Sequence, residues 1–315
     1  MSFAFSPAVR EQFKARIALC GPSGAGKTYT GLTMATAMGD PVAVIDTEHG
    51  SAAKYAKGKD GQGWEFDHLA MTSFEPLALV EALATAAQQR YPVILVDSLS
   101  HFWSGPGGML EQADAGARRF GGNSFAGWKE ARPMERQLIE AMLAYPGHVI
   151  ATMRSKTEYV IEEDDRGRKS PRKVGMRPEQ RDGIEYEFDI VGDLDWGHVL
   201  TVSKTRCSVL ADSVIAKPGA ELATTVLEWL SGGAEVRDPA SYIDQARDLA
   251  TFADAQELYA ELTARRLLYT PMLHPLSGQP ITLGTYVIER GHELRSAEAR
   301  AAAAASSTVP ADPAA

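Results

Sequence analysis

The stretch Gly21 to Thr28, GPSGAGKT, has the residue types and spacing of a phosphate-binding loop, G-x-x-x-x-G-K-[ST]. Glycines here allow successive backbone N–H groups to surround phosphate oxygens. Lys27 supplies a cation for the β and γ phosphates, and Thr28 a hydroxyl ligand for Mg²⁺. A strand-like run precedes the loop, and a helix expected to begin near Lys27 adds its positive end. The predicted triphosphate site comprises Gly21, Pro22, Ser23, Gly24, Ala25, Gly26, Lys27 and Thr28.

Two later apolar runs end in carboxylates. Residues 41–46 (PVAVID) continue into Thr47-Glu48-His49, and residues 91–97 (YPVILVD) end at Asp97. Ligands gather at the carboxyl ends of strands in an open parallel sheet, so both carboxylates should lie beside the loop. We expect Asp97 to hold Mg²⁺ and Glu48 to orient an attacking water. The alternative for Glu48 is an ordinary solvated loop residue.

Cations follow another predicted strand, residues 198–203, as Lys204 and Arg206. Such strand-end cations can reach a phosphate in their own subunit or in a neighbouring one. Alternatively, they are ordinary surface charges.

Strand-like and helical runs alternate along residues 16–230, which predicts an α/β fold with a mostly parallel twisted sheet flanked by helices. Helices are expected over 28–38, 74–89, 134–145 and 222–230, and strands near 148–153 and 186–191. A Ser-Gly-Gly sequence at 231–233 marks a boundary. We therefore predict an ATPase core over residues 1–232, a small helical module over 233–300 and a disordered tail over 301–315.

Two segments combine features that suit nucleic acid. Residues 101–132 are glycine-rich, which argues against a single regular element, and they mix cations with rings at Arg118, Arg119 and Phe120. This mixture suits a single-stranded nucleic acid, or a surface loop pinned by its aromatics. Residues 157–182, a hairpin or loop, are either a phosphate-backbone grip or a solvated loop balanced by nearby acids. The cations expected to contact DNA in this second segment are Arg166, Arg168, Lys169, Arg172 and Lys173.

Composition limits the possible functions. The chain has 315 residues and a formal charge of −9, so any nucleic-acid contact must come from local basic patches. Two cysteines, Cys20 and Cys207, suit neither a disulfide framework nor a zinc site. The sequence has no signal-like N-terminus and no apolar run of membrane-spanning length. We expect a cytoplasmic protein without a membrane partner.

Four stretches give the chain a family resemblance: GPSGAGKT, IDTEHGSAAKYA, VILVDSLS and SKTR, in this order within residues 10–230. The chain resembles the RecA-like P-loop ATPases, most closely the phage-encoded RecA-like or AAA-type ATPases associated with single-strand annealing and recombination. The resemblance implies a RecA-like P-loop NTPase core that uses ATP and Mg²⁺.

The resemblance also implies roles for individual residues. Glu48 matches the acidic base of the family and Tyr55 its adenine-stacking tyrosine. VILVDSLS matches the family's third stretch and supports a role for Asp97. Lys204 and Arg206 resemble cations that reach the γ-phosphate across a subunit interface, which requires a ring or filament.

Three points of the resemblance stay open. Ala52 replaces an acidic residue that helps to hold adenine in some RecA proteins, so base selectivity is undetermined. The nucleotide-state switch is either Thr152 or Arg154. The two candidate DNA segments correspond to the family's by position and not by residue.

The sequence therefore predicts an ATP- and Mg²⁺-dependent ATPase that single-stranded DNA stimulates, and that binds this DNA in recombination or annealing. Expected partners are single-stranded DNA, further copies of the chain, and a single-strand-binding or replication protein. Two alternatives stand: a RecA-fold replication motor or helicase-loader component, and a slow nucleotide-gated switch that binds a protein.

Overall fold

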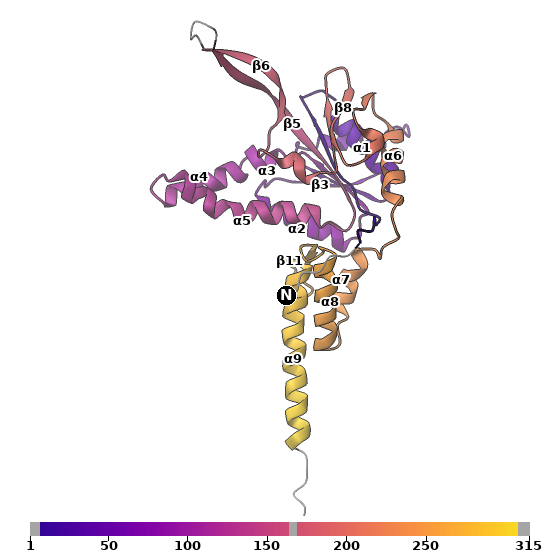
Figure 1. Ribbon diagram of the computed structural model, residues 1–315, viewed down its shortest axis with the longest axis vertical. Coiled ribbons are helices and arrows are strands. Elements are labelled where there is room, and N and C mark those ends of the chain that lie inside the picture. The colour runs from indigo at the N-terminus through magenta and orange to yellow at the C-terminus, as the bar shows by residue number, and fades with distance from the viewer. Residues whose placement is uncertain (1–6, 164–168, 308–315) are drawn as a thin grey trace, which may run out of the picture.

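The computed structural model describes residues 7–163 and 169–307 (Figure 1). Among them, nine strands form one sheet in the order β3-β2-β4-β5-β1-β7-β8-β9, with β6 paired to β5. Neighbours from β3 to β7 are parallel, whereas β8, β9 and β6 are antiparallel to their partners. The strands are β1 Arg16–Gly21, β2 Val42–Asp46, β3 Asp67–Ala70, β4 Val93–Asp97, β5 His148–Glu163, β6 Lys169–Pro178, β7 Ile190–Leu194, β8 Val199–Thr205 and β9 Val214–Ala216.

Helices cover both faces of this sheet. Alternate strand residues pack with α1 and α6 on one face and with α2 and α5 on the other. This arrangement confirms the predicted α/β fold of the P-loop NTPase type. The helices of this part are α1 Lys27–Met38, α2 Pro76–Gln88, α3 His101–Ser104, α4 Met109–Arg119, α5 Ser124–Leu143 and α6 Ala220–Ser231, with short 3₁₀ turns η1 Ala52–Tyr55, η2 Ile184–Glu187 and η3 Ser208–Leu210.

The central strands are short apolar runs because both of their faces are covered. Every residue of β1, β2 and β4 is buried. The parallel register aligns Asp46 with Asp97 and Gly21 with Arg154. These four residues therefore lie at the same edge of the sheet. This edge carries the candidate site.

Two arms leave the core in Figure 1. One is a hairpin of α4 and α5, and the other is the hairpin of β5 and β6, which was expected as a hairpin or loop. The prediction that a helix begins near residue 134 was wrong, because Asn123 caps α5 by accepting from the Ala126 N–H at 3.2 Å. Two glycines allow the helices of this arm to approach closely: a Cβ at Gly127 would lie 2.2 Å from the Ala113 carbonyl oxygen of α4, and a Cβ at Gly116 would lie 3.0 Å from the Gly127 Cα.

The strand predicted near 186–191 begins later than expected. Residues Ile184–Glu187 form η2, and β7 begins at Ile190. Phe188 is buried between them. The predicted strand is therefore a 3₁₀ turn followed by the start of β7.

The C-terminal part contains three helices and a two-stranded sheet within the described residues. Its side chains Tyr242, Leu258 and Val287 belong to the same apolar cluster as the α2 and α5 face. The tail predicted to be disordered from 301 was wrong up to Ser307, because the alanine run favours helix and α9 continues through it. Residues 308–315 lie outside the described residues, and the division into domains stays a prediction. The elements are α7 Ala240–Arg247, α8 Phe252–Ala264, β10 Pro271–Leu273, β11 Pro280–Thr282 and α9 Leu283–Ser307.

Candidate nucleotide-binding site

The loop between β1 and α1 forms an open cradle. Gly24 and Gly26 have positive φ angles of 82° and 91°, which side chains disfavour. Gly26 is the N-cap of α1, so the free N–H groups of the first helical turn point toward the space that the loop encloses. Lys27 folds back, and its Nζ donates to the carbonyl oxygens of Gly21 and Pro22 at 2.9 Å each. The geometry is that of an anion site.

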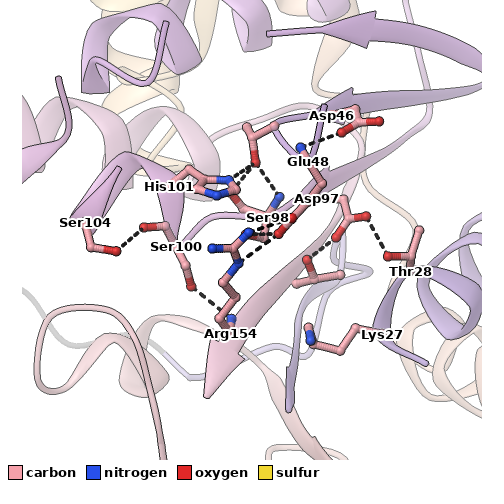
Figure 2. A network of polar contacts seen from close by, with 12 residues as sticks. Lys27, Thr28, Asp46, Glu48, Asp97, Ser98, Ser100, His101, Ser104 and Arg154 are labelled. Carbon is pink, nitrogen blue, oxygen red and sulfur yellow. Dashed lines mark hydrogen bonds and ion pairs between the residues drawn. The ribbon is translucent and has the colours of Figure 1, made fainter. Parts of the chain in front are cut away.

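Thr28 and Asp97 meet beside the cradle (Figure 2). The Thr28 hydroxyl donates to Asp97 Oδ2 at 2.7 Å, and the Thr152 hydroxyl donates to Asp97 Oδ1. Burial raises the pKa of Asp97, against the lowering effect of these two hydroxyls. Of the two residues considered as a switch, Thr152 thus contacts the carboxylate expected to hold metal.

The donor set fits magnesium better than a transition metal. Within the described residues, no group of three or more His, Cys, Asp or Glu side chains could hold a metal ion. Thr28 and Asp97 offer a hydroxyl and a carboxylate, which are hard oxygen ligands. Mg²⁺ is commonly bound by one or two such groups together with phosphate oxygens. These residues would hold Mg²⁺ in that way.

Asp46 positions the loop that carries Glu48. Its buried carboxylate accepts from the Glu48 N–H at 2.6 Å and from the Ala52 N–H at 3.0 Å. His68 Nε2 lies 3.0 Å from the same carboxylate. Asp46 therefore orders the loop, and Glu48 at its start projects toward β5.

Arg154 holds the Glu48 carboxylate in a two-pronged ion pair, which Figure 2 shows. Arg154 Nε donates to Oε1 at 2.9 Å and Nη2 to Oε2 at 2.6 Å, while the Ser98 hydroxyl donates at 3.3 Å. Partial burial raises the pKa of Glu48, but the hydrogen bonds and charge of Arg154 outweigh it and hold the pKa below its usual value. Of the two switch candidates, Arg154 is the one that contacts Glu48.

A cavity of about 1060 Å³ joins these groups. Lys27, Thr28, Glu48, Asp97 and Arg154 all line it. The structure thus brings together the loop and both carboxylates predicted from the sequence. Burial lowers the pKa of Lys27, while the charges of Asp97 and Glu48 oppose this effect.

Tyr55 lines the same cavity. Its ring is 38% exposed and makes edge contacts with Tyr29 and Trp64, at centroid distances of 6.3 and 6.2 Å. Tyr29 and Trp64 also contact each other at 4.8 Å. The position of Tyr55 suits a nucleobase, and Tyr29 and Trp64 are neighbours that no motif had indicated.

Lys204 and Arg206 lie away from this cavity. Strand β8 is antiparallel to β7, so its end returns to the amino-terminal edge of the parallel strands. There, Arg206 pairs with Asp189 at 2.9 Å, and both cations donate to the Phe188 carbonyl. The alternative that they act on their own subunit's phosphates was therefore wrong. Their role across a subunit interface stays a prediction.

Two further residues line the cavity and were not predicted as site residues from the sequence: His198 and Lys217. His198 Nδ1 lies 3.1 Å from the Ala25 carbonyl at the start of β8, and the antiparallel β9 brings Lys217 back to that edge. Lys217 N–H donates to the His198 carbonyl at 2.8 Å. No sequence motif indicates these two residues, because their positions depend on the antiparallel pairing of β8 and β9.

The predicted DNA contacts lie on the two arms. Arg118, Arg119 and Phe120 come together and are exposed at the end of α4, where Arg119 pairs with Glu130 at 2.6 Å. In the other arm, Lys169, Arg172 and Lys173 lie on β6, but their side chains are outside the described part of the structure. Arg166 and Arg168 lie outside the described residues altogether. The DNA contacts stay predictions.

The fold and the site together define a P-loop nucleotide-binding protein. A family model described as AAA domain matches residues 14–211, more than half of the chain. The chain therefore belongs to this AAA-domain family and is an AAA-like P-loop ATPase. A search of curated proteins finds no match. Within the described residues, no helix has the length and apolar character needed to span a bilayer.

Proposed function

We propose that the protein is an ATP- and Mg²⁺-dependent ATPase that binds single-stranded DNA and acts in recombination or strand annealing as a homo-oligomeric ring or filament. The observation that carries the proposal is the convergence of the phosphate loop, the Thr28–Asp97 pair and Glu48 on one cavity. The two arms support the DNA-binding part, because both leave the core and their sequences are rich in cations.

The proposed mechanism follows from the site residues. The loop N–H groups and Lys27 hold the triphosphate. Thr28 and Asp97 would hold Mg²⁺, which would neutralise charge on the phosphates. Glu48 accepts a proton from the attacking water. The water oxygen bonds to the γ phosphorus as the bond to the bridging oxygen breaks, which gives ADP and phosphate.

Arg154 opposes this role of Glu48 in the arrangement observed. A carboxylate held by a guanidinium at 2.6 Å has a lowered pKa and is a weaker proton acceptor. Hydrolysis then requires Arg154 to release Glu48 or to move with it. This ion pair specifically favours a second candidate function, a slow nucleotide-gated switch that binds a protein.

Completion by a neighbouring subunit is tested by mixing two inactive proteins. Lys204→Ala would lack the proposed cation, and Glu48→Gln would lack the proton acceptor. A mixed interface combines an intact Glu48 with an intact Lys204 in one of its two orientations. We therefore expect part of the ATPase activity to reappear on mixing. No recovery would contradict catalysis across subunits.

The DNA-binding part is tested separately with a fluorescent single-stranded oligonucleotide at low salt, with and without ATP and Mg²⁺. Binding that depends on nucleotide is expected. A lack of binding in both conditions would contradict the proposal and leave the protein-binding switch as the better account.

A further inference from the structure

The outer face of α5 carries an unusual row of side chains, here called the basic face: Phe125, Lys129, Arg132 and Arg136. Their spacing of four, three and four residues places them on one side of the helix. All four are exposed. Neighbouring members lie about 5–6 Å apart at Cβ, and the three cations span about 10 Å along the axis.

The cations of the basic face have no ion pair within the described residues. The acids next to them are engaged elsewhere: Glu130 pairs with Arg119 at 2.6 Å, and Glu135 with Arg181 at 3.4 Å. Among the described residues that line the adjacent hollow, Glu140 is the single acid, and it is half-buried. The face therefore presents excess positive charge on a chain whose formal charge is −9.

Exposed rings border these cations. Phe125 is 75% exposed, and Tyr269, from the loop between α8 and β10, is 48% exposed. Both line a hollow of about 460 Å³ together with Lys129, Arg132 and Arg136. Cations flanked by accessible rings suit a ligand that has both phosphates and flat bases.

We propose that a single-stranded nucleic acid lies along the basic face, with phosphates on Lys129, Arg132 and Arg136 and with bases stacked on Phe125 and Tyr269. This inference rests on the proposed function and assigns it to side chains of α5 and Tyr269, in addition to those predicted at the end of α4 and on the β5–β6 hairpin. An acidic polypeptide would satisfy the cations but would leave the rings without a partner. An unpaired strand satisfies both, because its bases are free to stack.

The test compares the wild type with the triple variant Lys129→Gln, Arg132→Gln, Arg136→Gln by fluorescence anisotropy of dT20 and rU20 over a salt series. The slope of log K against log salt is about −0.7 per phosphate contact on a single strand. Loss of three contacts should make the slope shallower by about 2. A matched control replaces three exposed cations elsewhere: Lys59→Gln, Arg266→Gln and Arg300→Gln.

The control should keep the wild-type slope on both probes, since it changes net charge equally without touching the basic face. Thermal melting of each protein shows whether it is folded. A further pair, Phe125→Ala and Tyr269→Ala, should each weaken binding about five- to 150-fold if a base stacks on each ring. Equal losses on dT20 and rU20 support shared backbone recognition, and a loss on one alone supports that nucleic acid as the ligand.

The outcomes separate the two claims. Wild-type protein that binds neither probe would overturn the proposed DNA-binding function and the inference with it. Wild-type binding with a basic-face variant that behaves like the control would overturn the inference alone. Displacement of dT20 by poly-glutamate at matched charge, with the ring variants unchanged, would overturn it in favour of an acidic protein partner.

Discussion

The nucleotide site and the basic face of α5 contrast in how their charges are held. In the nucleotide site, Asp97 accepts from two hydroxyls and Glu48 is held by Arg154. On the basic face, Lys129, Arg132 and Arg136 are exposed and lack ion pairs within the described residues. Groups that must act at fixed geometry are held by neighbours, whereas groups that attract a flexible polyanion can remain solvated.

The contrast predicts different responses to mutation. Loss of one member of the nucleotide site removes an oriented contact. Loss of one cation from the basic face only weakens the total electrostatic attraction to a polyanion. Three substitutions in the nucleotide site and one in the α4–α5 arm are expected to have effects of decreasing size.

Lys27→Ala should lower kcat/KM for ATP about 10²–10³-fold, because it removes a charged donor aimed at the phosphates. Steady-state phosphate release measures this effect. The matched control Lys59→Ala changes an exposed lysine outside the cavity and should remain within twofold of the wild type. Equal activity in the two variants would show that Lys27 acts as an ordinary surface charge and not as an oriented contact.

Arg154→Ala should move the acidic limb of the kcat–pH profile to higher pH. Partial burial raises the pKa of Glu48, and without Arg154 this effect is no longer outweighed. Glu48 must be ionised to accept a proton, so activity is lost at a higher pH as the solution is acidified. Arg154→Lys keeps the positive charge but loses the guanidinium that makes two hydrogen bonds to Glu48. It should therefore shift the acidic limb of the profile less than Arg154→Ala. An unchanged limb would argue against Glu48 as the proton acceptor.

Gly127→Ala should loosen the α4–α5 arm, because the new Cβ would collide with the α4 backbone at Ala113 and Ala117. Overpacking of this kind costs about 1–3 kcal/mol. Hydrogen exchange over residues 109–143 should rise, while triphosphate binding stays unchanged. Ala115→Val adds volume on the exposed side of α4 and serves as the control. Unchanged exchange in the arm would show that this close approach is not required.

Lys217→Ala should weaken ATP binding by up to about fivefold, because an exposed ion pair is worth about 0.2–1 kcal/mol. Lys217 is exposed and lines the cavity, so its attraction to a phosphate is screened by water. Titration with a fluorescent ATP analogue measures the change. Lys217→Arg keeps the charge and should bind nearly as the wild type. A loss as large as that of Lys27→Ala would move Lys217 into the oriented part of the site.

The nucleotide site was largely predictable because its signals are short. Gly24, Gly26 and Lys27 stand within one loop, and Asp97 ends a buried strand, so spacing alone implies their shared edge. The parallel order of the strands then fixes the side on which they meet. The Arg154–Glu48 contact depends on the pairing of β2 with β4 and of β4 with β5, so the sequence left Thr152 and Arg154 as equal candidates for the switch.

Other features depended on pairing over long distances in the chain. The antiparallel return of β8 and β9 removes Lys204 from its own site and brings Lys217 to it. The α4–α5 arm was not recognised because glycines usually interrupt helices, whereas Gly127 allows two helices to touch. The chemical role of a side chain was therefore easier to predict than the edge of the sheet at which the residue lies.

The coupling of the nucleotide site to DNA is tested most directly by the ATPase rate with and without single-stranded DNA under saturating ATP and Mg²⁺. We predict a slow basal rate, set by Glu48 held in its ion pair, and a clear increase on addition of DNA. The increase should be absent in Glu48→Gln. A rate that DNA leaves unchanged, in a preparation that binds ATP, would contradict the coupling of the nucleotide site to DNA.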